Sequence, residues 1–71
     1  MNSGVQLLAA NLARLRAQKR VSQVELARLL GIAPMAVEAL ENATNSNLTL
    51  DEIDALAKAL GVNPLALFQP V

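Results

Sequence analysis

The chain has 71 residues, 54% of them hydrophobic, so we expect a single small domain, 1–71. Its six basic and six acidic side chains cancel to a net charge of zero. It therefore lacks the basic excess that is common in nucleic-acid-binding proteins. Because it contains neither cysteine nor histidine, disulfides and thiolate chemistry are excluded and the commonest metal ligand and general base is missing, so we expect no enzyme activity, no metal and no cofactor. No apolar run approaches the roughly 20 residues that span a bilayer and no signal peptide opens the chain, so we expect a soluble cytoplasmic protein.

The first predicted element is a helix from about Gly4 to Lys19. Leu8, Leu12 and Leu15 recur at helical spacing, and Val5 lies one turn earlier. Basic side chains gather near its end and shortly after it: Arg14, Arg16, Lys19, Arg20 and Arg28. This cluster has two interpretations, a solvated helix end whose cations complement the helix dipole and a surface that contacts phosphates.

Two short helices joined by a tight turn follow. Ser22 and Glu25 have the spacing of a capping box, Gly31 stands where a left-handed residue ends a helix, and Pro34 is a favoured first residue of the next one. Ala27 is small enough for two helices to approach closely. The apolar positions are Leu26, Leu30, Ile32, Val37 and Leu40. This is the layout of a helix-turn-helix.

The rest of the chain predicts a loop and two more helices. Residues 42–47 are polar and rich in turn formers. Thr49 and Glu52 form a second capping box, ahead of an apolar face made of Leu50, Ile53, Leu56, Ala57 and Leu60. Gly61 ends that helix, and a last short one begins at Asn63 and Pro64. No alternation of period two competes, so the sequence predicts an all-α fold of five short helices.

Several spaced motifs resemble one family. Arg16 lies seven residues before Gln23, and the chain contains SQVELARLLGI from Ser22, LEN at Leu40 to Asn42, and LAKALGV at Leu56 to Val62. Together they resemble the lambda-repressor-like helix-turn-helix domain of phage repressors and Cro-type regulators, over roughly residues 7–68. The resemblance implies a compact bundle of five helices and a regulator that acts on operator DNA as a homodimer.

The resemblance assigns roles to three residues. Gln23 opens the second helix, where family members place a glutamine against the DNA backbone, and its amide can donate to a phosphate or to a neighbouring side chain. Arg16 and Glu41 occupy the positions of an arginine and a glutamate that pair in many relatives. We expect this pair to be structural, tying the first helix to the end of the third.

The third helix departs from the family at the positions that face bases: Ala33, Pro34, Met35, Glu38 and Ala39. Arginine and lysine suit guanine, asparagine and glutamine suit adenine, and none of these four types occurs between Ala33 and Glu41. Met35 can touch a thymine methyl group, and Glu38 can accept from a cytosine amine but also repels phosphates. Direct recognition of bases is therefore expected to be weak.

Two functions remain open. In the first, the protein is a transcriptional regulator that contacts double-stranded DNA mainly through its phosphates. The residues for this contact are Gln23, Asn42, Asn45, Asn47, Arg14, Lys19 and Arg28. In the second, the helix-turn-helix is a protein-binding module, an antiactivator or antirepressor that occupies another transcription regulator. Its apolar patch comprises Pro34, Met35, Ala36 and Ala39, rimmed by Glu38 and Asn42. A third interpretation of Met35 is that it folds back onto the core.

The end of the chain suggests self-association. It carries more apolar side chains than one short helix can bury: Leu65, Leu67, Phe68 and Val71. We expect Leu67 or Val71 to contribute to a symmetric homodimer interface and Phe68 to anchor the core. The alternative is a terminal helix that only covers the core.

Overall fold

The computed structural model describes residues 4–44 and 48–70, and within them it contains only helices and no strand. The elements are α1 (Gly4–Gln18), α2 (Gln23–Leu30), α3 (Pro34–Glu41), α4 (Leu50–Leu60) and a 3-10 helix, η1 (Pro64–Phe68). The all-helical prediction is confirmed, but the fifth expected helix is this single short 3-10 segment, so the described residues form four α-helices. None of their helices combines the length and the apolar character needed to cross a bilayer.

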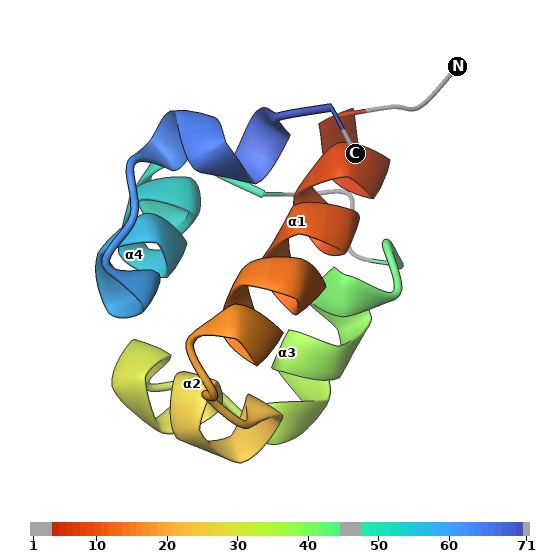
Figure 1. Ribbon diagram of the computed structural model, residues 1–71. Coiled ribbons are helices and arrows are strands. Elements are labelled where there is room, and N and C mark those ends of the chain that lie inside the picture. The colour runs from red at the N-terminus through yellow and green to blue at the C-terminus, as the bar shows by residue number, and fades with distance from the viewer. Residues whose placement is uncertain (1–3, 45–47, 71) are drawn as a thin grey trace.

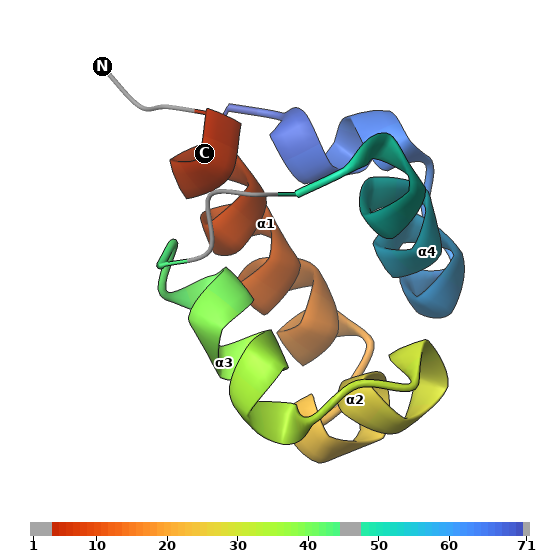
Figure 2. The ribbon, with the colours of Figure 1, turned by 180° about the vertical axis from the view of Figure 1, so that it is seen from behind.

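Helix α1 lies in the middle of the molecule, with α3 on one side and with α4 and η1 on the other (Figures 1 and 2). It packs against α3 and η1, while α2 packs against α3 and α4. The buried hydrophobic cluster between them draws on every element: Leu8, Leu12, Leu15, Leu26, Ala27, Val37, Leu40, Leu56, Ala57, Leu60 and Leu67. Two positions expected on apolar faces, Ile32 and Leu50, are instead exposed, Leu50 by 81%.

The helix ends follow the local sequence. Ser22 Oγ accepts the backbone N–H of Glu25 at 3.0 Å, and Thr49 Oγ1 accepts that of Glu52 at 3.2 Å, which satisfies N–H groups that have no partner within the helix. Gly31, after α2, has a φ of 70°, a left-handed conformation that glycine adopts without steric strain. The turn between α2 and α3 is therefore dictated locally.

The 3-10 geometry of η1 changes which C-terminal side chains face inward. Three residues per turn place Leu65 and Phe68 on one face, and this face is outside, since the two side chains are 75% and 37% exposed. Leu67 is fully buried. The predictions that Phe68 anchors the core and that Leu67 forms a symmetric interface are wrong, because Leu67 already fills the core of its own chain. Val71 lies outside the described residues.

Asn11 is a buried polar side chain that ties η1 to α1. It is fully buried, and its Nδ2 donates to the carbonyl oxygens of Leu67 at 3.0 Å and Gln69 at 2.8 Å. Its Oδ1 accepts from Nη2 of Arg14 at 2.9 Å. Because every polar atom of the amide has a partner, its burial is compatible with a stable core.

Asn11→Ala is expected to lower the free energy of unfolding by about 2 kcal/mol, because the buried carbonyl of Leu67 then loses its donor. Urea unfolding followed by circular dichroism measures this change. Gln18→Ala, which truncates an exposed amide at the end of α1, is the matched control and should leave the midpoint near that of the unmodified chain. An equal midpoint for Asn11→Ala would show that the two bonds to the C-terminal segment contribute nothing net.

Candidate functional site

Helix α3 has an exposed face. Met35, Glu38 and Asn42 follow one another at intervals of three and four residues, so they share one face, and all three are exposed. Val37 and Leu40 lie on the opposite face and are buried against α1 and α2. Met35 is 78% exposed, so the interpretation in which it folds back onto the core is wrong.

The start of α3 is apolar and has no side-chain cap. Ala33 occupies the N-cap position with an extended backbone and makes no side-chain hydrogen bond to the helix, and Pro34 is the first helical residue. Both side chains are exposed, and Ala39, further along α3, is half-buried. The face therefore presents a methionine, small apolar groups, the carboxylate of Glu38 and the side-chain amide of Asn42.

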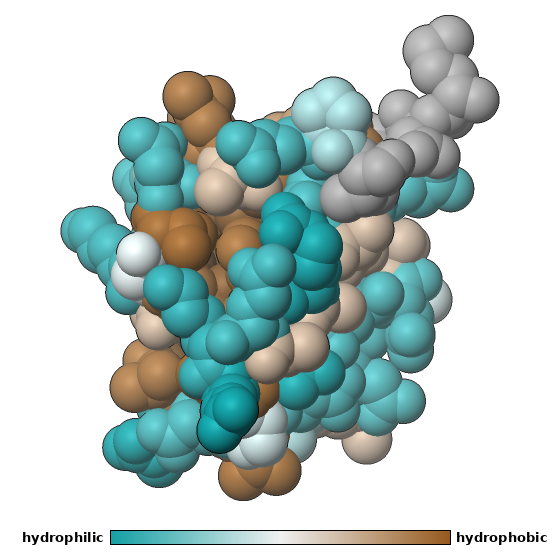
Figure 3. Space-filling view, in the orientation of Figure 1, coloured by the Kyte–Doolittle hydropathy of each residue, from teal (hydrophilic) through white to brown (hydrophobic). Residues whose placement is uncertain are grey.

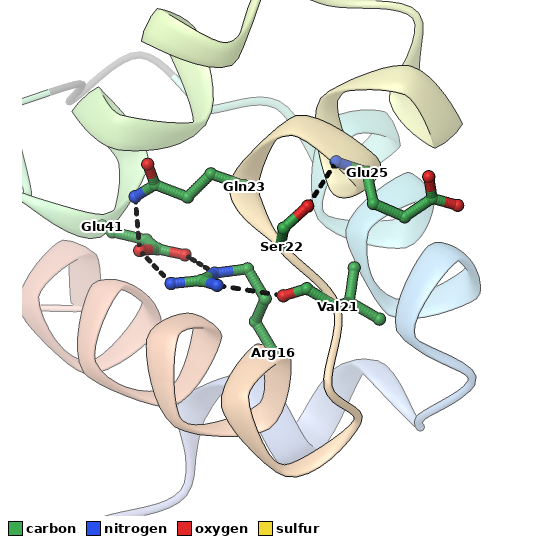
Figure 4. A network of polar contacts seen from close by, with 6 residues as sticks. All are labelled: Arg16, Val21, Ser22, Gln23, Glu25 and Glu41. Atoms are coloured by element: carbon green, nitrogen blue, oxygen red, sulfur yellow. Dashed lines mark hydrogen bonds and ion pairs between the residues drawn. The ribbon is translucent and has the colours of Figure 1, made fainter.

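A network of polar side chains joins α1, α2 and α3 at the edge of this face (Figure 4). Arg16 Nε donates to Glu41 Oε2 at 2.6 Å, and Arg16 Nη2 donates to Glu41 Oε1 at 3.2 Å. The same guanidinium reaches the carbonyl of Val21 through Nη1 at 2.9 Å. Gln23, the first residue of α2, donates from Nε2 to Glu41 Oε1 at 2.9 Å. Arg16 and Glu41 thus meet, and Glu41 also engages Gln23.

The charge of this network is stabilised by its own contacts. The side chains of Arg16 and Glu41 are 21% and 8% exposed. Burial alone raises the pKa of Glu41, but the hydrogen bonds from Arg16 and Gln23 and the positive charge of Arg16 outweigh it and lower that pKa below its usual value. The hydrogen bond to Glu41 in turn raises the pKa of Arg16. Both groups are therefore charged at neutral pH.

The three cations assigned to phosphate contact lie in different places. Arg14 bonds to Asn11, whose amide reaches the carbonyls of η1 and the following residue, so Arg14 lies on the η1 side of α1, away from α3. Lys19 is exposed in the turn between α1 and α2. Arg28 is exposed on α2, where its Nε and Nη2 bond to both carboxylate oxygens of Glu25 at 3.1 and 2.5 Å.

The pair between Arg28 and Glu25 also changes the predicted capping box. The carboxylate of Glu25 binds the guanidinium of Arg28, and this hydrogen bond lowers the pKa of Glu25. Ser22 accepts the backbone N–H of Glu25 as expected. The half of the capping box made by Ser22 is therefore formed, while the side chain of Glu25 bonds to Arg28 and not back to the N-cap.

Two further predicted residues, Asn45 and Asn47, lie outside the described residues. The sequence did not single out Asn11, although a signal existed: it stands within the apolar stripe of Leu8, Leu12 and Leu15, where a polar residue needs a buried partner. The sequence indicated that Gln23 can donate to a neighbouring side chain, but it did not name Glu41 as that side chain. Their separation of 18 residues leaves no local pattern to detect.

Two concave surfaces formed by the described residues are mainly apolar. A groove of about 130 Å³ is lined by Leu30, Ile32, Leu40, Leu48, Glu52, Ala55 and Leu56. A second, of about 220 Å³, is lined by Gly4, Val5, Leu8, Leu48, Ile53 and Phe68. Within residues 4–44 and 48–70 no three acidic side chains are grouped to hold a metal ion.

Comparison with known families agrees with this geometry. Residues 12–67, which contain all of α2, α3 and α4, match the family model described as helix-turn-helix. The chain belongs to the Cro/C1-type helix-turn-helix family. A search of curated protein sequences finds no match.

Solved structures similar to this helix-turn-helix protein include two regulators. A hypothetical transcription factor, NHTF, from Neisseria is 37% identical, with a TM-score of 0.88 over 96% of this chain and 77% of that one. The restriction-modification controller protein C.AhdI from Aeromonas hydrophila is 34% identical, with a TM-score of 0.82 over 90% of this chain and 96% of that one. The family and these neighbours identify the chain as a helix-turn-helix regulator.

A third similar structure is larger than this helix-turn-helix protein. HppE, in its apo form, is 34% identical with a TM-score of 0.91 over 96% of this chain, but the match covers only 38% of the HppE chain. The same fold therefore occurs there as one part of a longer polypeptide.

Proposed function

We propose that this regulator binds double-stranded DNA and holds it mainly through phosphate contacts, with little direct recognition of bases by α3. The observation that supports this proposal is the composition of the exposed face of α3, where Met35, Glu38 and Asn42 stand without any arginine or lysine. Such a face can touch thymine methyl groups and accept from cytosine, but most of the affinity must come from groups that contact the DNA backbone.

The groups best placed for backbone contact lie at the end of α3 and in the turn that leads to α2. Gln23 stands at the start of α2 beside the end of α3, Lys19 precedes it in the turn, and Asn42 follows the last residue of α3. Arg28 joins them if DNA displaces the exposed contact with Glu25. Arg14 is left out of this surface, because its guanidinium is held on the η1 side of α1.

The test is fluorescence anisotropy of a labelled duplex of mixed sequence, titrated with the protein at several salt concentrations. Binding is expected to weaken steeply with salt, since each neutralised phosphate releases counterions. Lys19→Ala should reduce the slope of log affinity against log salt by about 1. Arg14→Ala removes the same charge from the η1 side of α1 and should leave the slope unchanged.

Equal slopes for the two variants would contradict the proposed orientation. Absence of binding at about 50 mM salt with protein near 100 μM, a concentration at which non-specific contacts of DNA-binding proteins are detectable, would contradict DNA binding itself.

One observation favours a second function, the protein-binding module. Met35 is 78% exposed beside the exposed Pro34, an apolar surface suited to docking on another transcription regulator.

We further propose that the regulator forms a homodimer through the outer face of η1. Leu65 and Phe68 expose apolar surface there. In the view of Figure 3, hydrophobic side chains show at the top and left, over η1 and α4, and others show over α2 at the bottom, while the right of this view is more hydrophilic. Exposed apolar clusters of this kind are typical of interfaces.

Leu65→Glu is expected to shift a dimeric sample to monomer in sedimentation velocity, because a buried, unpaired carboxylate at a symmetric interface is introduced twice. The control is Val24→Glu, which places the same charge at an exposed apolar position on α2 and should leave the sedimentation coefficient unchanged. A Leu65→Glu sample that still sediments as a dimer would place the interface elsewhere.

A further inference from the structure

The amide of Gln23 has a defined orientation. A carboxylate accepts hydrogen bonds and donates none, so the contact of 2.9 Å between Gln23 and Glu41 Oε1 requires the nitrogen of the amide, and not its oxygen, to face Glu41. Figure 4 shows the amide oxygen of Gln23 directed away from that carboxylate. One N–H is used by Glu41, and the second N–H and the oxygen remain for a ligand.

Glu41 is itself held in place. Arg16 donates two hydrogen bonds to its carboxylate and a third to the carbonyl of Val21, directly before the N-cap of α2. The side chain of Glu41 is only 8% exposed, so water competes little for its oxygens. A charge-assisted bond donated to a shielded, immobilised carboxylate holds the Gln23 side chain more firmly than a bond to a mobile surface group.

We propose that Glu41 is a positioning residue for DNA contact: its ion-paired carboxylate holds the Gln23 amide in one orientation, so that Gln23 meets the phosphate backbone with its one remaining N–H. This inference rests on the DNA-binding function proposed above. Orienting the amide before DNA arrives removes the loss of side-chain freedom that an exposed glutamine suffers on binding. Arg16 acts behind Glu41 and touches no DNA.

A double-mutant cycle measured by anisotropy at one salt concentration tests the coupling. In the unmodified chain, Gln23→Ala should weaken DNA binding about tenfold, the effect of losing one hydrogen bond to a charged group. In the Glu41→Gln background, the acceptor-only group is gone and the Gln23 amide can turn over, so the same substitution should weaken binding less than about threefold by the same scale.

The cycle cancels the effect of the negative charge lost in Glu41→Gln, because both members of that background lack this charge. Glu41→Asp is the second background: it keeps the negative charge but moves it away from Gln23, and the effect of Gln23→Ala should again shrink. Glu41→Asp also allows the coupling to be measured if the Glu41→Gln variant does not fold. Gln18→Ala, an exposed glutamine at the end of α1, should have no effect in any background.

The orientation has a readout that needs no DNA. In NMR spectra of the unmodified protein, one side-chain amide proton of Gln23 should be shifted downfield and exchange slowly, in contrast to those of Gln18, and this difference should vanish in Glu41→Gln. Gln23 protons like those of Gln18, or a tenfold effect of Gln23→Ala in every background, would overturn the inference alone. Absence of DNA binding by the unmodified chain would overturn the proposed function together with it.

Discussion

Leu12→Ala is expected to lower the free energy of unfolding by about 3 to 5 kcal/mol, because it removes a fully buried leucine and leaves a cavity that the surrounding helices fill only in part. Leu12 lies on α1, the helix that packs against both α3 and η1. Domains of this length have about 4 to 10 kcal/mol in total, so the variant should lose a third or more of its stability and unfold at a clearly lower temperature and urea concentration.

The measurement is thermal and urea unfolding followed by circular dichroism. Leu50→Ala makes the same chemical change at a leucine that is 81% exposed, and it should alter the free energy of unfolding by less than about 0.5 kcal/mol. Similar losses for the two variants would mean that the core is not where the buried cluster places it.

Glu41→Ala is expected to lower the free energy of unfolding by about 3 kcal/mol, since it removes one partner of a mostly shielded ion pair and leaves the guanidinium of Arg16 without its counter-charge. The hydrogen bond from Gln23 is lost as well. Glu38→Ala is the matched control: it removes the same side chain from the exposed face of the same helix and should change stability by less than about 0.5 kcal/mol.

The same pair makes stability depend on pH. The pKa of Glu41 is lowered from its usual value of 4.5 by its contacts in the folded chain, so its stabilising contribution is fully present above that value and is lost as the pH falls through the lower folded pKa. Unfolding measured down this acidic range should show a weaker pH dependence for Glu41→Gln than for the unmodified chain. An unchanged pH dependence would contradict the charge-assisted pair.

Local sequence determined most of the helices. Ser22 and Thr49 cap two of them, Gly31 and Gly61 end them in left-handed conformations, and the leucines of α1 recur at helical spacing. These signals act within four or five residues of one another, where backbone hydrogen bonds and steric limits decide the conformation. The spaced motifs also sufficed to recognise the family to which the chain belongs.

The candidate site was only partly predictable. The sequence indicated that α3 lacks the usual base-contacting side chains, because the residue types in that segment suffice to show it. It did not indicate that Arg14 is turned to Asn11, that Arg28 is paired with Glu25, or that Gln23 bonds to Glu41. A helical pattern places a side chain on a face, but it does not choose among the partners within reach.

The sequence by itself therefore determined the helical class, the turn of the helix-turn-helix and the family, because caps, glycine turns and apolar spacing are local properties of the chain. Only the tertiary structure decided that Leu67 lies inside while Leu65 and Phe68 lie outside. The reason is that Asn11, 56 residues from Leu67 along the chain, donates from Nδ2 to the carbonyl oxygen of Leu67 and so holds η1 in one register. A 3-10 helix also distributes its side chains differently from the α-helix that periodicity predicts. Contacts between distant segments, which no local pattern encodes, made that choice.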